Sequence, residues 1–281
     1  MVMASRRVAL LPGVVAGAAL LIAAARPAVA LPALIAQGIA VFAAIMWRGR
    51  PLPQDLAYHR FVDQRTGRVC SPLLSVPNAS DVVSNIVFFV FGVDGVVAVA
   101  QPGRIPLRSP AAEYPALLTL FVSVTMVAFG SAYYHWRPCN RRLVWDRLPM
   151  SFGFASVIYL VVCERVPASV AWLYVLVVIS ATSVIYWAVV DDLRPYLFVQ
   201  FYGIVFLIQV MAVLPSLYTH ASLWPTVLAV YVLAKIAEVL DAQIFRWTKR
   251  TVSGHTVKHL LAGVIFKHVT LTLKQRRLLT G

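Results

Sequence analysis

Long apolar runs separated by short polar loops recur along the whole chain. Seven such runs follow residue 82, most of them near the roughly 20 residues that a helix needs to cross a bilayer. They cover residues 83–100, 115–135, 149–162, 168–190, 196–214, 221–245 and 255–273. The pattern predicts an all-α polytopic membrane protein whose core, residues 83–281, has seven transmembrane helices.

Two more apolar runs precede this core. Arg6 and Arg7 are followed by a run over residues 8–25, and a second run over 28–47 comes directly after it. We favour a hairpin of two extra spans within residues 1–50. Because residues 27–30 resemble a signal-peptidase site, a cleaved signal followed by one span is the alternative. Residues 51–82 are polar, and we expect them to form a loop outside the membrane.

Composition and charge agree with a membrane protein. The 281 residues are 60% hydrophobic and only 13% charged, about half the charged share of a soluble domain. The net charge of +14 would suggest nucleic acid in a soluble protein, but here the cations lie mostly in loops. That placement fits anionic lipid headgroups instead. We expect a multi-pass integral membrane protein, in the plasma or inner membrane if the chain is bacterial, with a membrane lipid and no nucleic acid as partner.

A few polar residues stand where a membrane helix would not favour them. Ser131 and His135 lie four residues apart at the end of the second core run, so a helix places both on one face. His255 and His259 repeat this spacing at the start of the seventh run, and Asp146 precedes the third. Ionisable groups inside spans are costly and usually functional.

Strict alternation of seven spans brings these positions together. The end of the second run, the start of the third and the start of the seventh must lie on the same side of the membrane. Three histidines at one level of a helix bundle suggest a metal site, and three neutral imidazoles would leave Zn²⁺ an open fourth position. Asp146 is then a candidate general acid and base, and Ser131 a candidate to orient water or stabilise an oxyanion. The alternative is that these histidines bond loops or headgroups at the interface.

The same residues resemble a known family. Ser131, His135 and the segment Asp146-Arg-Leu-Pro-Met150, followed by His255 and His259, resemble the alkaline ceramidases. These enzymes belong to a wider group of seven-helix membrane hydrolases that includes the adiponectin and progestin receptors. Ser84-Asn85 in the first core run also resembles that family, and the likeness covers about residues 78–272.

The resemblance implies a zinc-dependent membrane amidase. His135, His255 and His259 would bind zinc, Ser131 would position the water, and Asp146 would pass its proton to the leaving amine. The substrate would be ceramide or a related N-acyl lipid, cleaved to a fatty acid and a free amine. Two alternatives stay open: a hydrolase of a non-sphingoid N-acyl lipid, and a receptor-like lipid-binding protein with a structural metal site.

In one region the chain departs from the family. The eukaryotic enzymes carry an acidic, calcium-binding N-terminal stretch, whereas this chain offers only Asp63 and Asp81, with Arg65 close by. We expect no calcium regulation, and we expect the two aspartates to form ion pairs between loop and core.

Lesser candidates lie on the sixth and seventh core runs. Lys235 and Glu238 are three residues apart on one helical face and are expected to pair inside the bundle. Asp241 is a candidate to orient a histidine ligand, with a structural role as the alternative. Lys258, between the two C-terminal histidines, has no expected metal role. Tyr133, Tyr134 and Trp136 are expected in the aromatic belt at the membrane interface.

The charge distribution and the resemblance disagree on the side of the membrane. Lys and Arg are more numerous in the loops on the histidine side, which favours a cytoplasmic site. The resemblance implies the lumenal or external side. Because cationic loops that attract anionic lipids would bias such a count, we favour the external side and keep the other open.

Overall fold

The structure, a computed structural model, describes residues 27–68 and 75–279 of the chain. Its helices are α2 (Pro27–Arg48), the 3₁₀ turn η1 (Leu56–His59), α3 (Ala79–Val83), α4 (Ile86–Ala100), α5 (Pro110–Trp136), α6 (Asn140–Cys163), α7 (Ala171–Val190), α8 (Arg194–Leu197), the π-helical turn η2 (Phe198–Tyr202), α9 (Gly203–Val213), α10 (Leu223–Val239), α11 (Asp241–Trp247) and α12 (Gly254–Gln275). Two short strands, β1 (Gly67–Arg68) and β2 (Ser75–Val76), pair antiparallel.

The predicted all-α membrane fold is confirmed for the described residues. Six of their helical segments are long and apolar enough to cross a bilayer, and α10 with α11, bent by 78°, makes a seventh. The helix α12 carries three lysines and is less apolar, but it packs between α10 and α4 inside the bundle. The first predicted span, residues 8–25, lies outside the described residues.

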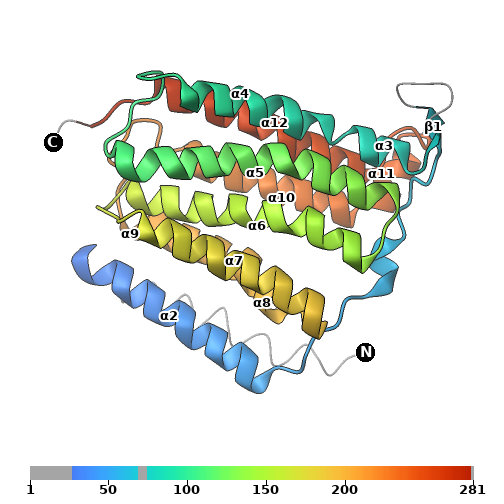
Figure 1. Cartoon of the computed structure of the whole chain (residues 1–281), viewed down its shortest axis with the longest axis horizontal. Helices are drawn as coiled ribbons and strands as arrows, with labels where there is room; N and C mark the ends of the chain where they lie inside the picture. Colours follow the sequence, from blue (N-terminus) through green and yellow to red (C-terminus); the bar gives the residue numbers. More distant parts are fainter. Residues whose placement is uncertain (1–26, 69–74, 280–281) are drawn as a thin grey trace.

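The helices form a bundle of nearly parallel rods (Figure 1). α5 packs between α4 and α6, α7 covers α6, and α12 lies between α4 and α10, while α2 packs on the outer side of α9. Leu120 and Leu160 are fully buried between these helices, whereas Val178 and Val239 on outer faces are 62% and 80% exposed. Apolar side chains therefore cover both the inside and the outside of the bundle, as contact with lipid requires.

Two core helices begin earlier than the apolar pattern predicts. α6 begins at Asn140 rather than near residue 149, so Asp146 lies in its second turn and Pro149 lies inside the helix. Helical structure also starts at Ala79 instead of Val83. The first turns of both helices are polar, so they do not belong to an apolar run. The prediction from apolar runs therefore placed both helix starts too late.

The polar segment that joins α2 to α3, called the connecting segment below, crosses the end of the bundle. Its start is held by hydrogen bonds from the Leu52 amide to Asp192 (3.1 Å) and from the Gln54 amide to Asp191 (3.0 Å). Its end is held by Arg65, whose guanidinium reaches the Thr251 carbonyl at 2.8 Å. The segment is therefore fixed at both ends across the surface where α5 ends and α12 begins.

Candidate metal centre

Three histidines meet in the buried interior at one end of the bundle. His135 lies in the last turn of α5, and His255 and His259 lie in the first two turns of α12. Their candidate ligand nitrogens are all within 4.8 Å of one another, and the Nε2 atoms of His135 and His255 are 3.2 Å apart. None of the three residues is more than 6% exposed. This histidine cluster could hold one metal ion, and the alternation of spans predicted the meeting.

The start of α12, which carries two of the histidines, is fixed by its neighbours. Ser253 caps the helix by accepting a hydrogen bond from the Thr256 amide at 2.9 Å. Asp81 of α3 accepts hydrogen bonds from the Ser253 hydroxyl at 3.2 Å and from the Thr256 hydroxyl at 2.9 Å. Asp241 of α11 accepts from the backbone amide of His255 at 2.9 Å. Hydrogen bonds from α3 and α11 therefore hold this turn.

This arrangement settles two predictions about aspartates. Asp241 bonds the backbone of His255 and not its ring, so it supports the ligand through the helix end. Asp63 forms an ion pair, but with Arg65 of its own segment at 2.6 Å and not with the core as predicted. For Asp81 the prediction of an ion pair is wrong, because its Oδ1 bonds hydroxyl groups of α12.

Two further hydrogen-bond contacts of the histidines come from Asn78 and Ser84, on either side of α3. Ser84 lies 2.7 Å from Nδ1 of His259, which leaves Nε2 as the free ring nitrogen of that side chain. The side-chain amide of Asn78 donates to the backbone carbonyl of His135 at 2.8 Å. Nδ1 of His135 is buried and has no hydrogen-bond partner among the described residues. The residues around Ser84 therefore orient the cluster from a third direction.

Phe61 of the connecting segment covers the cluster. Its ring centroid is 4.6 Å from that of His135 and 5.2 Å from that of His255. Next to it, His59 lies within hydrogen-bond distance of the Tyr134 hydroxyl (2.9 Å) and of Asn140 Oδ1 (2.8 Å). The segment therefore seals the histidines from the end of the bundle.

Tyr134 consequently departs from the aromatic belt that the sequence predicts. It is 1% exposed, while its neighbours Tyr133 and Trp136 are each 43% exposed. A helix turns by about 100° per residue, so adjacent aromatic residues cannot all face the lipid. Tyr134 points inward and joins Phe61 and His59 above the cluster.

Ser131 and Asp146 lie side by side between α5 and α6. Ser131 is 2% exposed and Asp146 is 9% exposed, and the hydroxyl lies close to the carboxylate. Oδ1 of Asp146 is buried and finds no hydrogen-bond partner within the described part of the chain. The sequence thus predicted two residues that the fold brings together beside the cluster.

A close approach of two backbones explains why these side chains meet. Pro149 has no amide hydrogen, so the carbonyl of Trp145, four residues earlier, lacks its usual helical partner. The helix α5 approaches this carbonyl at Gly130, where a Cβ atom would lie only 2.0 Å from the oxygen. Only glycine fits at that position, and Ser131 comes directly after it.

Lys258 has no expected metal role from the sequence, and its contact with the histidine cluster was not predicted. Lys258 Nζ lies 2.9 Å from Nε2 of His255 and donates to Glu238 of α10 at 2.9 Å. Glu238 also pairs with Lys235 at 2.8 Å, as predicted. One turn of helix separates Lys258 from His255 on the same face, and this i,i+3 spacing was the available signal.

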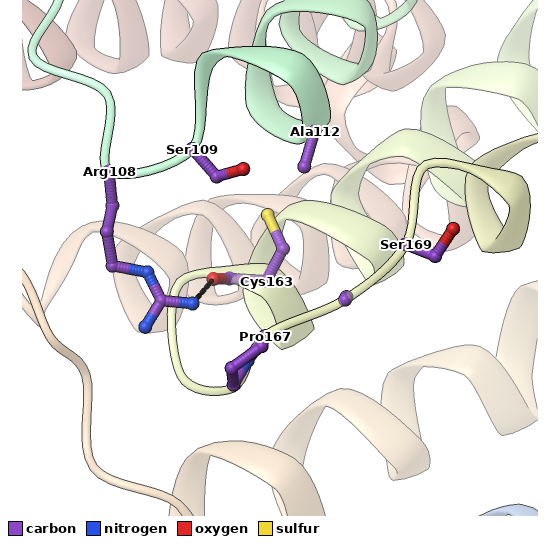
Figure 2. Close-up of a pocket in the computed structure, with 7 residues that line it drawn as sticks. Arg108, Ser109, Ala112, Cys163, Pro167 and Ser169 are labelled. Atoms are coloured by element: carbon purple, nitrogen blue, oxygen red, sulfur yellow. Dashed lines mark hydrogen bonds between the residues drawn. The ribbon is translucent and has the colours of Figure 1, made fainter.

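A hollow lies at the start of α5 and the end of α6, the end of the bundle opposite the histidines, and Figure 2 shows the residues that line it. It has a volume of about 350 Å³ and is lined by Arg108, Ser109, Ala112, Cys163, Pro167, Ala168 and Ser169. The Arg108 guanidinium donates to the Cys163 carbonyl across it at 3.2 Å, as the close-up shows. This hollow holds none of the predicted site residues.

Comparisons of the chain with protein-family models, curated proteins and solved structures give no match. The fold and the site together define a multi-pass helical membrane protein with a buried three-histidine cluster. The resemblance to the alkaline ceramidases stays a prediction that rests on the motif residues.

Proposed function

We propose that the protein is a zinc-dependent membrane amidase that hydrolyses ceramide or a related N-acyl lipid. One observation carries the proposal. Three buried imidazoles, from His135 and from two residues at least 120 positions later, converge within 4.8 Å. The buried carboxylate of Asp146, whose Oδ1 has no partner among the described residues, lies against Ser131, one helical turn before His135. A purely structural histidine group would not require a buried carboxylate next to it.

The donor set fits zinc. Two imidazole nitrogens at tetrahedral positions of one zinc ion are about 3.3 Å apart, because each Zn–N bond is about 2.0–2.1 Å. The 3.2 Å between Nε2 of His135 and Nε2 of His255 agrees with that value. Zinc would bind Nε2 of His255, the nitrogen that Lys258 contacts here. The Lys258 ammonium would then keep only its hydrogen bond to Glu238.

Zinc bound by three neutral imidazoles supplies Lewis-acid chemistry and lowers the pKa of a bound water towards about 7. Asp146 would accept the water's proton at its unpartnered Oδ1 and return it to the amine that leaves. The Ser131 hydroxyl would orient the water and donate to the developing oxyanion. The apolar bundle interior suits an acyl chain, which would enter laterally from the membrane.

One observation favours a second candidate, a lipid-binding protein with a structural metal site. Phe61 packs directly on two of the histidines, and structural zinc sites are closed in this way. In that case the metal would hold α5 and α12 together, and the protein would bind lipid without cleaving it.

Elemental analysis of the purified full chain and a product assay test the proposal. We expect about one zinc per chain, and release of fatty acid from labelled N-acyl lipids. His135→Ala, His255→Ala and His259→Ala should each abolish turnover and lower the zinc content, whereas the exposed His220→Ala should change neither. Full activity in a variant that lacks all three histidines would overturn the mechanism. Bound zinc without product from any N-acyl lipid would support the lipid-binding alternative.

A further inference from the structure

A cleft beside the histidine cluster collects uncompensated positive charge. It has a volume of about 610 Å³, and its lining residues are Val62, Asp63, Gln64, Arg65, Ala242, Phe245, Arg246 and Arg250. One wall is the connecting segment and the other is α11 with the turn that follows. We call it the arginine cleft, since three arginines face a single acidic residue.

Only one of the three arginines has a charge partner within the described residues. Arg65 binds Asp63 through two hydrogen bonds, at 2.7 Å and 2.6 Å. Burial opposes ionisation of this carboxyl, but the hydrogen bonds from Arg65 outweigh it and lower the pKa of Asp63 below its ordinary value. Arg246 and Arg250 form no ion pair inside the described part of the chain. Their charges are free to bind an anion.

The turn that carries Arg250 is built at a conformational cost. Lys249 and Arg250 both adopt left-handed backbone angles, with φ of 53° and 62°, which L-residues other than glycine rarely do. The Thr248 hydroxyl stabilises the turn by donating to the Val252 carbonyl at 2.7 Å. The amide of Arg250 also bonds the Phe245 carbonyl at 2.7 Å. Arg250 is therefore held at the rim of the cleft rather than displayed on a free loop.

Both walls of the arginine cleft continue directly into the histidine site. Phe61, which covers the cluster, is two residues before Asp63, a chain distance of at most about 7 Å. Asp241, which holds the His255 amide, immediately precedes Ala242. A ligand in the cleft therefore lies next to the segment that covers the histidines.

The position of α11 indicates a lipid as the source of the anion. α11 is bent by 78° from α10, so it lies across the end of the bundle rather than along it. Its last residue, Trp247, is 73% exposed, and tryptophan is enriched at the level of lipid headgroups. In the cleft itself, Phe245 stacks under Arg65, with 5.4 Å between the guanidinium and the ring. Apolar and cationic groups thus meet at the headgroup level.

We propose that the arginine cleft binds the phosphate group of an anionic lipid headgroup. Two free guanidinium groups match the charge of a phosphate monoester and can each bind it through two parallel hydrogen bonds. If the protein is the amidase proposed above, the cleft selects a phosphate-bearing N-acyl lipid as substrate; this second step rests on the proposed function.

Binding to the full-length protein in detergent tests the first step, with native mass spectrometry as the readout. The probes are phosphatidate and diacylglycerol with the same acyl chains, which differ only in the phosphate. We expect phosphatidate to bind at least tenfold more tightly. The double variant Arg246→Gln/Arg250→Gln should lose at least tenfold of that affinity, because both free charges are removed.

A matched double variant controls for total charge. Arg104→Gln/Arg277→Gln removes two exposed arginines at the other end of the bundle and should stay within twofold of the wild type. Equal binding of the two lipids, or the same loss in both double variants, would overturn the proposal. Millimolar inorganic phosphate should not displace phosphatidate; complete displacement would assign the cleft to free phosphate and overturn the lipid source. His259→Ala should bind phosphatidate like the wild type, so this test is independent of catalysis.

Hydrolysis kinetics test the second step. The substrates are two N-acyl lipids that differ only in a headgroup phosphate. Arg246→Gln/Arg250→Gln should raise KM for the phosphorylated lipid at least tenfold without changing its kcat. Both KM and kcat for the neutral lipid should stay as in the wild type. An equal change for both lipids would overturn the substrate assignment.

Discussion

At the scale of single residues, the ring of His259 depends on one hydroxyl group. Ser84 lies 2.7 Å from Nδ1 and is itself 6% exposed, so no solvent competes for that nitrogen. A partner on the second ring nitrogen fixes both the tautomer and the rotation of a ligand histidine. The first core helix therefore helps to orient the histidine cluster without supplying a histidine to it.

Removing this hydroxyl should weaken metal binding without breaking the fold. For Ser84→Ala we expect a 10- to 100-fold lower zinc affinity, the usual effect of losing such a partner. Competition with a chelator of known affinity measures it. Ser156→Ala is the control, because that buried hydroxyl bonds only a carbonyl of its own helix, at 2.9 Å. Equal affinities in the wild type and Ser84→Ala would contradict the role.

Asp146 should separate metal binding from turnover. In Asp146→Asn the amide keeps the size of the side chain but cannot accept a proton at neutral pH, so hydrolysis should fall by about 10²–10⁴-fold. Zinc content should stay at the wild-type level, because Asp146 is not among the three ligands. Asp94→Asn, which loses a half-buried ion pair with Lys267, is the control. Loss of zinc together with activity would instead make Asp146 a metal ligand.

The sequence predicted the meeting of the histidines for a physical reason. Helical spacing and strict alternation of spans are long-range constraints, and together they place His135 and His255 at one level. The covering by Phe61 could not be predicted this way, because the connecting segment has no periodic pattern that fixes its path. The contact of Lys258 with His255 likewise depends on which side chain points inward, and an ammonium between two imidazoles gave no reason to expect it.

At the scale of elements, Arg194 joins three segments. Its guanidinium donates to the carbonyls of Met46 and Gly49 at the end of α2, and it pairs with Asp192 at 2.6 Å. Asp192 in turn accepts the amide of Leu52. The hydrogen bonds from Arg194, stronger than the opposing effect of burial, lower the pKa of Asp192 to about 2. A single ion pair thus attaches α2 and the connecting segment to α8.

Loss of Arg194 should release this attachment locally. In Arg194→Met the last carbonyls of α2 lose their partner and Asp192 is left buried without its counter-charge. We expect amide hydrogen exchange over residues 49–54 to accelerate at least tenfold, while α5 and α12 exchange as in the wild type. Arg48→Met, the exposed last residue of α2, is the control. Unchanged exchange over 49–54 would show that α2 is held by other contacts.

Element boundaries were harder to predict than element existence. The seven core helices were all predicted, because each contains an apolar run. The start of α6 was placed nine residues late, since Pro149 is typical of a helix start and the preceding turns are polar. The bend between α10 and α11 leaves no apolar break and was therefore missed.

At the scale of the whole molecule, one end of the bundle contains the histidine cluster and the other contains a buried network of ion pairs. At the end opposite the histidines, Arg276 is 2% exposed and binds Glu113 at 2.8 Å and Glu164 at 2.6 Å. Tyr218 and Trp224 complete these hydrogen bonds. Burial, the largest influence, raises the pKa of Glu164 above its ordinary value although Arg276 opposes the shift. This network fastens the end of α12 to α5 and α6.

Breaking the network should destabilise the entire bundle. Arg276→Met leaves buried Glu113 without an ion-pair partner and leaves Glu164 with only Arg165, at 3.9 Å. It should lower the free energy of unfolding by about 3 kcal/mol. Thermal unfolding in detergent measures this as a lower Tm. The double variant Arg276→Met/Glu113→Gln should recover part of the loss, since Glu113 no longer carries a charge and Glu164 keeps Arg165 as a partner. A Tm equal to that of the wild type in Arg276→Met would contradict a stabilising role.

The distance along the chain between the histidines also has a consequence for biosynthesis. The ribosome completes α5 long before α12. Of the three clustered histidines, a nascent chain therefore contains only His135 until its final segment has been inserted. Metal capture would then come last, after every preceding span is in the bilayer. A protein truncated before residue 254 would keep most of its spans and lose two of its three ligands. If the cluster binds zinc as proposed, zinc retention would therefore distinguish finished chains from arrested ones in a membrane extract.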